Sequence, residues 1–147
     1  MPVIFLILGL AVFFLHRIFQ KKPQKETLRL LLFYLVFFSF GVNRVFDFIA
    51  QVFFSEKIAA ILGFTAGGAF QFQVGVASLA LGVLGILCFW LRGGFLFAAV
   101  LGNVIFLWGS ALGYLLYSDS AGVYFWADAL IPLFILYIYW LCVRDRR

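Results

Sequence analysis

Five long apolar stretches, separated by short polar segments, run through the whole chain. A helix needs about 20 mostly apolar residues to cross the hydrocarbon of a bilayer, and each stretch comes close to that length. The pattern predicts an all-α integral membrane protein that forms a single transmembrane domain over residues 1–147. We expect its helices at about residues 2–19, 28–54, 71–91, 95–117 and 123–143. Residues 55–63 are expected to form a short interfacial helix.

The distribution of basic residues predicts the orientation of these helices, because cytoplasmic loops carry an excess of Lys and Arg. Nine of the eleven basic residues fall on one predicted side: Arg17, Lys21, Lys22, Lys25, Arg29, Arg92, Arg144, Arg146 and Arg147. The loops of the opposite side hold Lys57, and Arg44 lies within a helix. We therefore expect the N-terminus outside, the C-terminus in the cytoplasm, and a multi-pass protein of the inner (plasma) membrane.

Composition supports the membrane class and argues against several others. The chain is 66% hydrophobic and 12% charged, far from the values of a soluble domain. Its net charge of +5 does not indicate nucleic-acid binding, because membrane topology accounts for the basic residues. His16, Cys88 and Cys142 form no metal-ligand or paired-thiol motif. The sequence predicts no catalytic residue, no metal, no cofactor and no nucleic-acid partner.

Two opposite charges lie inside the second predicted helix, in a run that is otherwise almost wholly apolar. Arg44 stands three residues before Asp47, so the two side chains can form an ion pair within the helix. Asn43, Asp47 and Gln51 follow at intervals of four and share one helical face. Charges at this depth are costly and face a partner or a wet cavity. The pair either locks helix packing or belongs to a binding site.

A third charge, Asp128, lies near the outer end of the fifth helix. Pro132 follows four residues later and cannot donate a hydrogen bond to the Asp128 carbonyl. Asp128 either meets interfacial water or Arg44, or it contacts a solute, proton or cation. The polar residues of the outer half together predict a pocket that opens to the extracytoplasmic side: Asn43, Arg44, Asp47, Gln51, Gln71, Ser110, Tyr114 and Asp128.

Small residues form stripes on the third and fourth predicted helices. Such stripes let two helix backbones approach closely in a membrane. The third helix carries Gly75, Ser78, Gly82 and Gly85, and the fourth carries Gly102, Gly109 and Gly113. We expect these helices to pack against each other as a tight antiparallel hairpin.

Four segments resemble a family of small prokaryotic membrane proteins known as domain of unknown function 6790. They lie between about Val42 and Pro132 and read FFSEKIAAILGF, FQFQVGVASLALGVLGIL, FLWGSALGYLLY and AGVYFWADALIP. The resemblance implies an inner-membrane helix bundle without a known activity. In the family pattern, acidic or histidine residues are usual where this chain has Gln51, Gln73 and Tyr114. Asp128 matches the family's aspartate before the proline, which implies a pocket or structural role.

Three functions are compatible with this sequence. The first is a membrane protein without enzymatic activity, in contact with lipid, that forms a homo-oligomer or an accessory subunit of another membrane protein. The second is a carrier or channel for a small solute or ion that uses the outer pocket. The third is an enzyme acting on a lipid or quinone, which would need Asp47 and Asp128 to approach each other as an acid–base pair.

Overall fold

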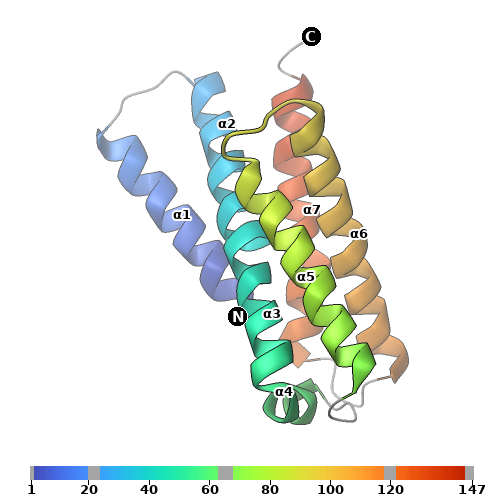
Figure 1. The fold of residues 1–147 in the computed structure, drawn as a ribbon. Helices are drawn as coiled ribbons and strands as arrows, with labels where there is room; N and C mark the ends of the chain where they lie inside the picture. The colour runs from blue at the N-terminus through green and yellow to red at the C-terminus, as the bar shows by residue number, and fades with distance from the viewer. Residues whose placement is uncertain (1, 20–23, 63–67, 118–121, 145–147) are drawn as a thin grey trace.

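The computed structural model describes residues 2–19, 24–62, 68–117 and 122–144, and these residues are almost entirely helical (Figure 1). The elements are α1 (Pro2–Phe19), α2 (Gln24–Leu35), η1 (Val36–Val42), α3 (Asn43–Phe53), α4 (Ser55–Leu62), α5 (Ala69–Leu87), α6 (Gly94–Tyr117) and α7 (Gly122–Arg144). Because α2, η1 and α3 form one continuous span, five helices among these residues are long and apolar enough to cross a membrane. The predicted all-α architecture with five such helices is confirmed.

Some helix boundaries differ from the expected ones. α2 begins at Gln24, before the expected start at residue 28. The apolar run marks only the part of the helix that can lie in the bilayer, and the helix itself continues into the polar residues that precede this run. α5 ends at Leu87 rather than at residue 91, and a turn follows in which Phe89 N donates to Ile86 O at 3.1 Å. α4 occupies the place of the expected interfacial helix, whose predicted last residue, Gly63, lies outside the described residues.

A π-helical segment, η1, lies in the middle of the second span. Its hydrogen bonds reach five residues back rather than four, as in the bond from Asn43 N to Phe38 O. Phe40 and Gly41 of this segment are buried, so the irregular turns lie inside the bundle. The apolar pattern did not predict η1, because its residues are of the same kind as those of the α-helical turns around it.

The small residues of α5 pack against the second span. A Cβ atom added to Gly85 would lie 2.7 Å from Gly41 N, and one added to Gly82 would lie 2.9 Å from Arg44 Cβ. Gly75 faces α3 in the same way, with Val52 Cγ2 at 3.1 Å from an added Cβ. Because these glycines have no side chain, the backbone of α5 can pack directly against η1 and α3.

The small residues of α6 have different surroundings. A Cβ atom at Gly102 would lie 3.3 Å from Leu81 Cδ2 of α5, whereas one at Gly109 or Gly113 would meet nothing within 4 Å. The prediction that the two stripes pack against each other as a tight hairpin is therefore wrong. Small residues indicate where a neighbour can approach closely, but they do not indicate which neighbour does.

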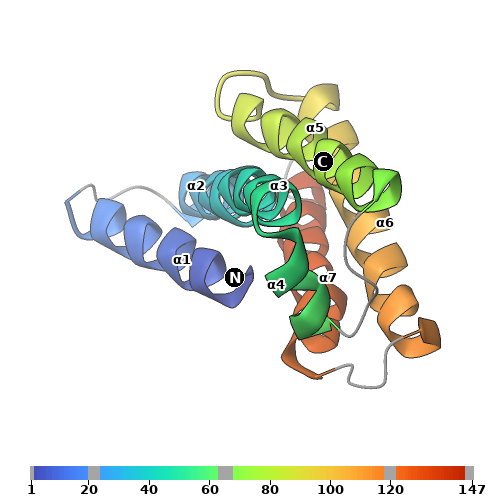
Figure 2. The same ribbon diagram turned by 60° about the horizontal axis from the view of Figure 1, so that its bottom comes forward.

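The buried core does not extend between all of the helices. Side chains of α2, η1, α6 and α7 meet in this core, among them Leu35, Val36, Phe40, Val100 and Ile135. Beyond the core, α3 packs mainly on α5 and α6 packs mainly on α7. The two pairs of helices diverge in Figure 2, and α4 lies at this end of the bundle. The polar residues that the sequence analysis assigned to a pocket lie between the two pairs.

We predict that Gly85→Ala lowers the free energy of unfolding by about 1–3 kcal/mol, because an added methyl group would push the backbones of α5 and η1 apart. The matched control is Gly109→Ala, where the added Cβ meets nothing within 4 Å. This control should be neutral or stabilise the helix by up to about 1 kcal/mol. Thermal unfolding in detergent measures both variants, and equal effects would contradict the packing of α5 on η1.

Candidate functional site

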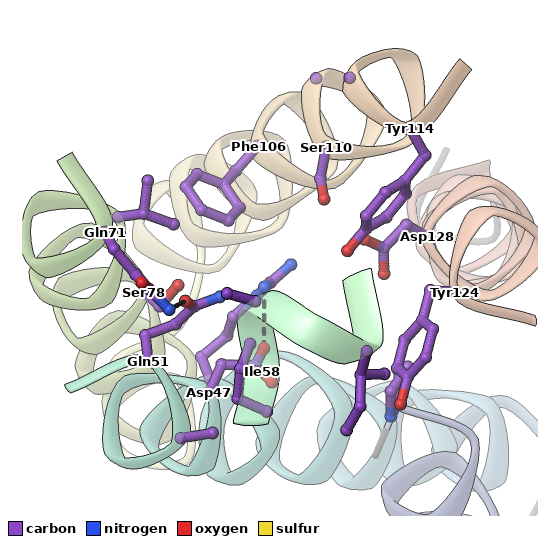
Figure 3. A pocket seen from close by; sticks show the side chains of 18 of the residues that line it. Asp47, Gln51, Ile58, Gln71, Ser78, Phe106, Ser110, Tyr114, Tyr124 and Asp128 are labelled. Atoms are coloured by element: carbon purple, nitrogen blue, oxygen red, sulfur yellow. Dashed lines mark hydrogen bonds and ion pairs between the residues drawn. The ribbon is translucent and has the colours of Figure 1, made fainter. Parts of the chain in front are cut away.

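A cavity of about 740 Å³ lies between the α3–α5 pair and the α6–α7 pair (Figure 3). Residues from α1 and α4 also contribute to its wall. The structure places all eight polar residues singled out in the sequence around this one cavity: Asn43, Arg44, Asp47, Gln51, Gln71, Ser110, Tyr114 and Asp128. Four helices, α3, α5, α6 and α7, thus bring their polar residues together.

Arg44 and Asp47 form an ion pair on α3. Arg44 Nη1 donates to Asp47 Oδ2 at 2.9 Å, and Asn43 Nδ2 donates to the same oxygen at 3.3 Å. The Arg44 residue is 4% exposed, while the Asp47 side chain is 27% exposed. The acid is therefore the more accessible member, and the guanidinium is the group that depends on partners inside the protein.

The hydrogen-bonding capacity of the Arg44 guanidinium is only partly used. Its Nε and Nη2 atoms are buried and have no hydrogen-bond partner in the described structure. The Phe106 ring of α6 lies over the guanidinium, 4.8 Å from Cζ to the ring centroid. This contact contributes a cation–π interaction on one face of the guanidinium. It does not supply an acceptor for the two N–H groups, which are costly to leave unpaired in a buried site.

Gln51 and Gln71 join three helices at the edge of the cavity. Gln71 Nε2 donates to Gln51 Oε1 at 3.0 Å and to Ser55 O at 3.0 Å. The first bond links α5 to α3, and the second links α5 to the start of α4. These contacts fix the position of α4 beside the cavity, so both glutamines have a structural role that their type and spacing did not reveal.

Asp128 lies on the opposite wall from Arg44. It is 9% exposed, and the Ser110 and Tyr114 side chains of α6 point toward it (Figure 3). Ser110 is within hydrogen-bonding reach of the Asp128 carboxylate. Pro132 lies inside α7, so the Asp128 carbonyl lacks its usual helical donor. The carboxylate and hydroxyl groups of this wall can accept a hydrogen bond from a ligand or bind a cation.

The cavity also has lining residues that the sequence analysis did not single out. Phe106 is one of them, although it precedes Ser110 and Tyr114 at intervals of four and so shares their helical face. Ile58 and Ala59 of α4 line the cavity as well, which places the apolar side of this short helix against the site. Tyr124 of α7 completes the wall near Asp128. Helical spacing could have found Phe106, but not the residues of α4.

The remaining titratable candidates lie elsewhere. His16 Nδ1 is 2.8 Å from the Tyr34 hydroxyl, in a contact between α1 and α2 that does not line the cavity. Cys88 and Cys142 are both buried. Within the described part of the chain, no group of three or more His, Cys, Asp or Glu residues could hold a metal ion.

Five apolar helices, with a cavity and buried charges between them, are the architecture of a multi-pass helical membrane protein. The chain belongs to DUF6790, a family of unknown function, whose sequence model matches residues 1–147. This match covers more of the chain than the resemblance between about Val42 and Pro132, which it confirms. No curated protein and no solved structure matches the chain.

We predict that Arg44→Leu destabilises the protein by about 3 kcal/mol, because removing one member of a buried pair leaves the other charge without its partner. The double variant Arg44→Leu with Asp47→Leu should recover most of this loss, since neither charge then remains. Thermal unfolding in detergent of both single variants and the double variant gives the coupling energy. A double variant no more stable than the single variants would contradict a structural role for the pair.

Proposed function

We propose that this protein binds a small molecule that carries both a negative and a positive group, and that it acts as a binding protein or carrier without enzymatic activity. The observation that carries the proposal is the state of Arg44, whose Nε and Nη2 atoms are buried beside the cavity without a partner. These two N–H groups lie on one edge of the guanidinium. That edge matches a carboxylate or phosphate, which can accept two parallel hydrogen bonds.

We infer the positive group of the ligand from the carboxylates that line the cavity. Arg44 already interacts with Asp47, so the local charge of α3 is balanced. Asp128 on α7 has hydroxyl groups near it but forms no ion pair with a cationic partner among the described residues. An ammonium group would supply one, because buried carboxylates require pairing or strong hydrogen bonds. A ligand with both charges would therefore complement the two walls at once.

We propose further that the cavity faces the extracytoplasmic side of the inner membrane. Arg17 and Arg144 lie at the ends of α1 and α7, Arg92 lies in the turn between α5 and α6, and none of them lines the cavity. Lys57 on α4, in contrast, directly precedes the cavity-lining Ile58. The positive-inside rule assigns the end with more basic residues to the cytoplasm. The polar cavity would then receive its ligand from the outer half of the bilayer or from outside the cell.

A second proposed function is that of an accessory subunit or homo-oligomer. It is favoured by the open surface of α6, where Gly109 and Gly113 have no neighbour within 4 Å of an added Cβ. A helix of another membrane protein could approach this surface closely. This function predicts a fixed protein partner rather than a small ligand.

Native mass spectrometry of the protein, extracted gently from its own membrane, tests these functions. We expect a bound small molecule in the wild-type protein and its loss in Arg44→Gln and in Asp128→Asn, since each substitution removes one charge of the cavity. The matched controls are Arg92→Gln and Glu56→Gln, which make the same chemical changes outside the cavity. Both controls should keep the bound molecule.

Two results would contradict the proposed binding function. One is a wild-type protein that carries a protein partner in fixed proportion and no small molecule, which would favour the accessory subunit. The other is a bound molecule that persists in both cavity variants, which would place its binding site elsewhere. Circular dichroism of each variant shows whether the helical fold is retained.

A further inference from the structure

We infer that the ligand is a membrane aminophospholipid, which enters the cavity sideways between α5 and α6 with its headgroup toward Arg44 and Asp128. This inference rests on the proposed binding function and names the ligand class and its route. Three features carry it: an opening between two helices, an apolar edge around this opening, and the opposite charges inside.

The first feature is the separation of α5 and α6 at the level of the cavity. The two helices touch near Asn103, whose Nδ2 atom lies 3.4 Å from Leu81 O, and at Gly102, where an added Cβ would be 3.3 Å from Leu81 Cδ2. Further along α6, Gly109 and Gly113 line the cavity and would meet nothing within 4 Å. The contact between the helices thus ends where the cavity wall begins.

The second feature is the apolar character of the edge. Ile105 on α6 and Phe70 on α5 both line the cavity, and they are 63% and 78% exposed. In a membrane, exposed side chains of this type on spanning helices face lipid chains. At these two residues, the lipid-facing surface is therefore continuous with the cavity lining. A hydrocarbon chain fits such an edge better than a fully water-soluble molecule does.

The third feature is the pair of charged walls. A phosphate group can accept two hydrogen bonds from Nε and Nη2 of Arg44, in the geometry that favours Arg for phosphate binding. An ammonium group on the same molecule can pair with Asp128. An anionic lipid without an amine would leave Asp128 unpaired beside a second acid, Asp47. A cavity of about 740 Å³ is also in the size range of ligand sites.

The test measures thermal unfolding of the delipidated protein in detergent, with three probes added separately. The probes are dioleoyl phosphatidylethanolamine, dioleoyl phosphatidylglycerol and the chain-free headgroup glycerophosphoethanolamine. We expect the phosphatidylethanolamine to raise the Tm in proportion to the logarithm of its concentration once its site is filled. The other two probes should need about tenfold higher concentrations or more for the same shift.

Gly109→Leu tests the route, because it adds a bulky side chain to the cavity wall at a position where an added Cβ meets no atom of the described residues within 4 Å. It should reduce the apparent affinity for phosphatidylethanolamine by about tenfold or more. The matched control is Gly94→Leu at the start of the same helix, where an added Cβ also meets no described atom within 4 Å and the residue does not line the cavity. Gly113→Leu serves as a second route variant if Gly109→Leu does not fold.

The outcomes separate this inference from the proposed function. If the chain-free headgroup stabilises the wild-type protein and Gly109→Leu as well as the lipid does, a lipid ligand and lateral access are wrong while the binding function stands. If phosphatidylglycerol raises the Tm as much as phosphatidylethanolamine does, the inference that the ligand has a zwitterionic headgroup is wrong. If no probe shifts the Tm of the wild-type protein and native mass spectrometry finds no bound molecule, the binding function itself fails.

Discussion

The burial of one arginine side chain inside an apolar span constrains much of this structure. Arg44 is 4% exposed, and α5 approaches it so closely that a Cβ at Gly82 would lie 2.9 Å from Arg44 Cβ. This contact is part of the close packing of α5 on the second span. The same guanidinium reaches Asp47 on its own helix and the Phe106 ring on α6. Packing around a single buried cation thus closes one side of the bundle and leaves the cavity on the other.

The π-helical segment sets the direction of the polar face that follows it. A π-helix has more residues per turn than an α-helix, so it rotates the residues after it relative to those before it. η1 ends at Val42, directly before Asn43 and Arg44, and its Gly41 contacts α5. The turns before η1 contribute to the core, and the turns after it carry the residues that face the cavity. One continuous span can therefore serve the core in one half and the polar site in the other.

The sequence predicted where the spans lie and which polar residues line the cavity, but it did not predict which helices pack against each other. Hydropathy marks a span because the bilayer demands a long apolar run, and the few polar residues within spans stand out against it. The eight polar candidates consequently surround one cavity. In contrast, Gly82 and Gly85 revealed a close approach but not that the second span makes it, since a glycine carries no information on its partner. Phe106 could not be chosen from composition among the 21 Phe residues, and η1 leaves no pattern of its own.

The arrangement of the charges favours binding over a purely structural role. A pair that serves packing alone is expected to use its hydrogen-bonding groups on protein partners, because any group left over adds a desolvation cost. Arg44 instead uses Nη1 for Asp47, and among the described residues Nε and Nη2 have no partner and no side chain fills the adjacent cavity. A structure selected only for stability would close this space with apolar side chains, as it does around Ile135 and Val100 at the other end. A local departure of this kind from the packing rules is typical of a functional site.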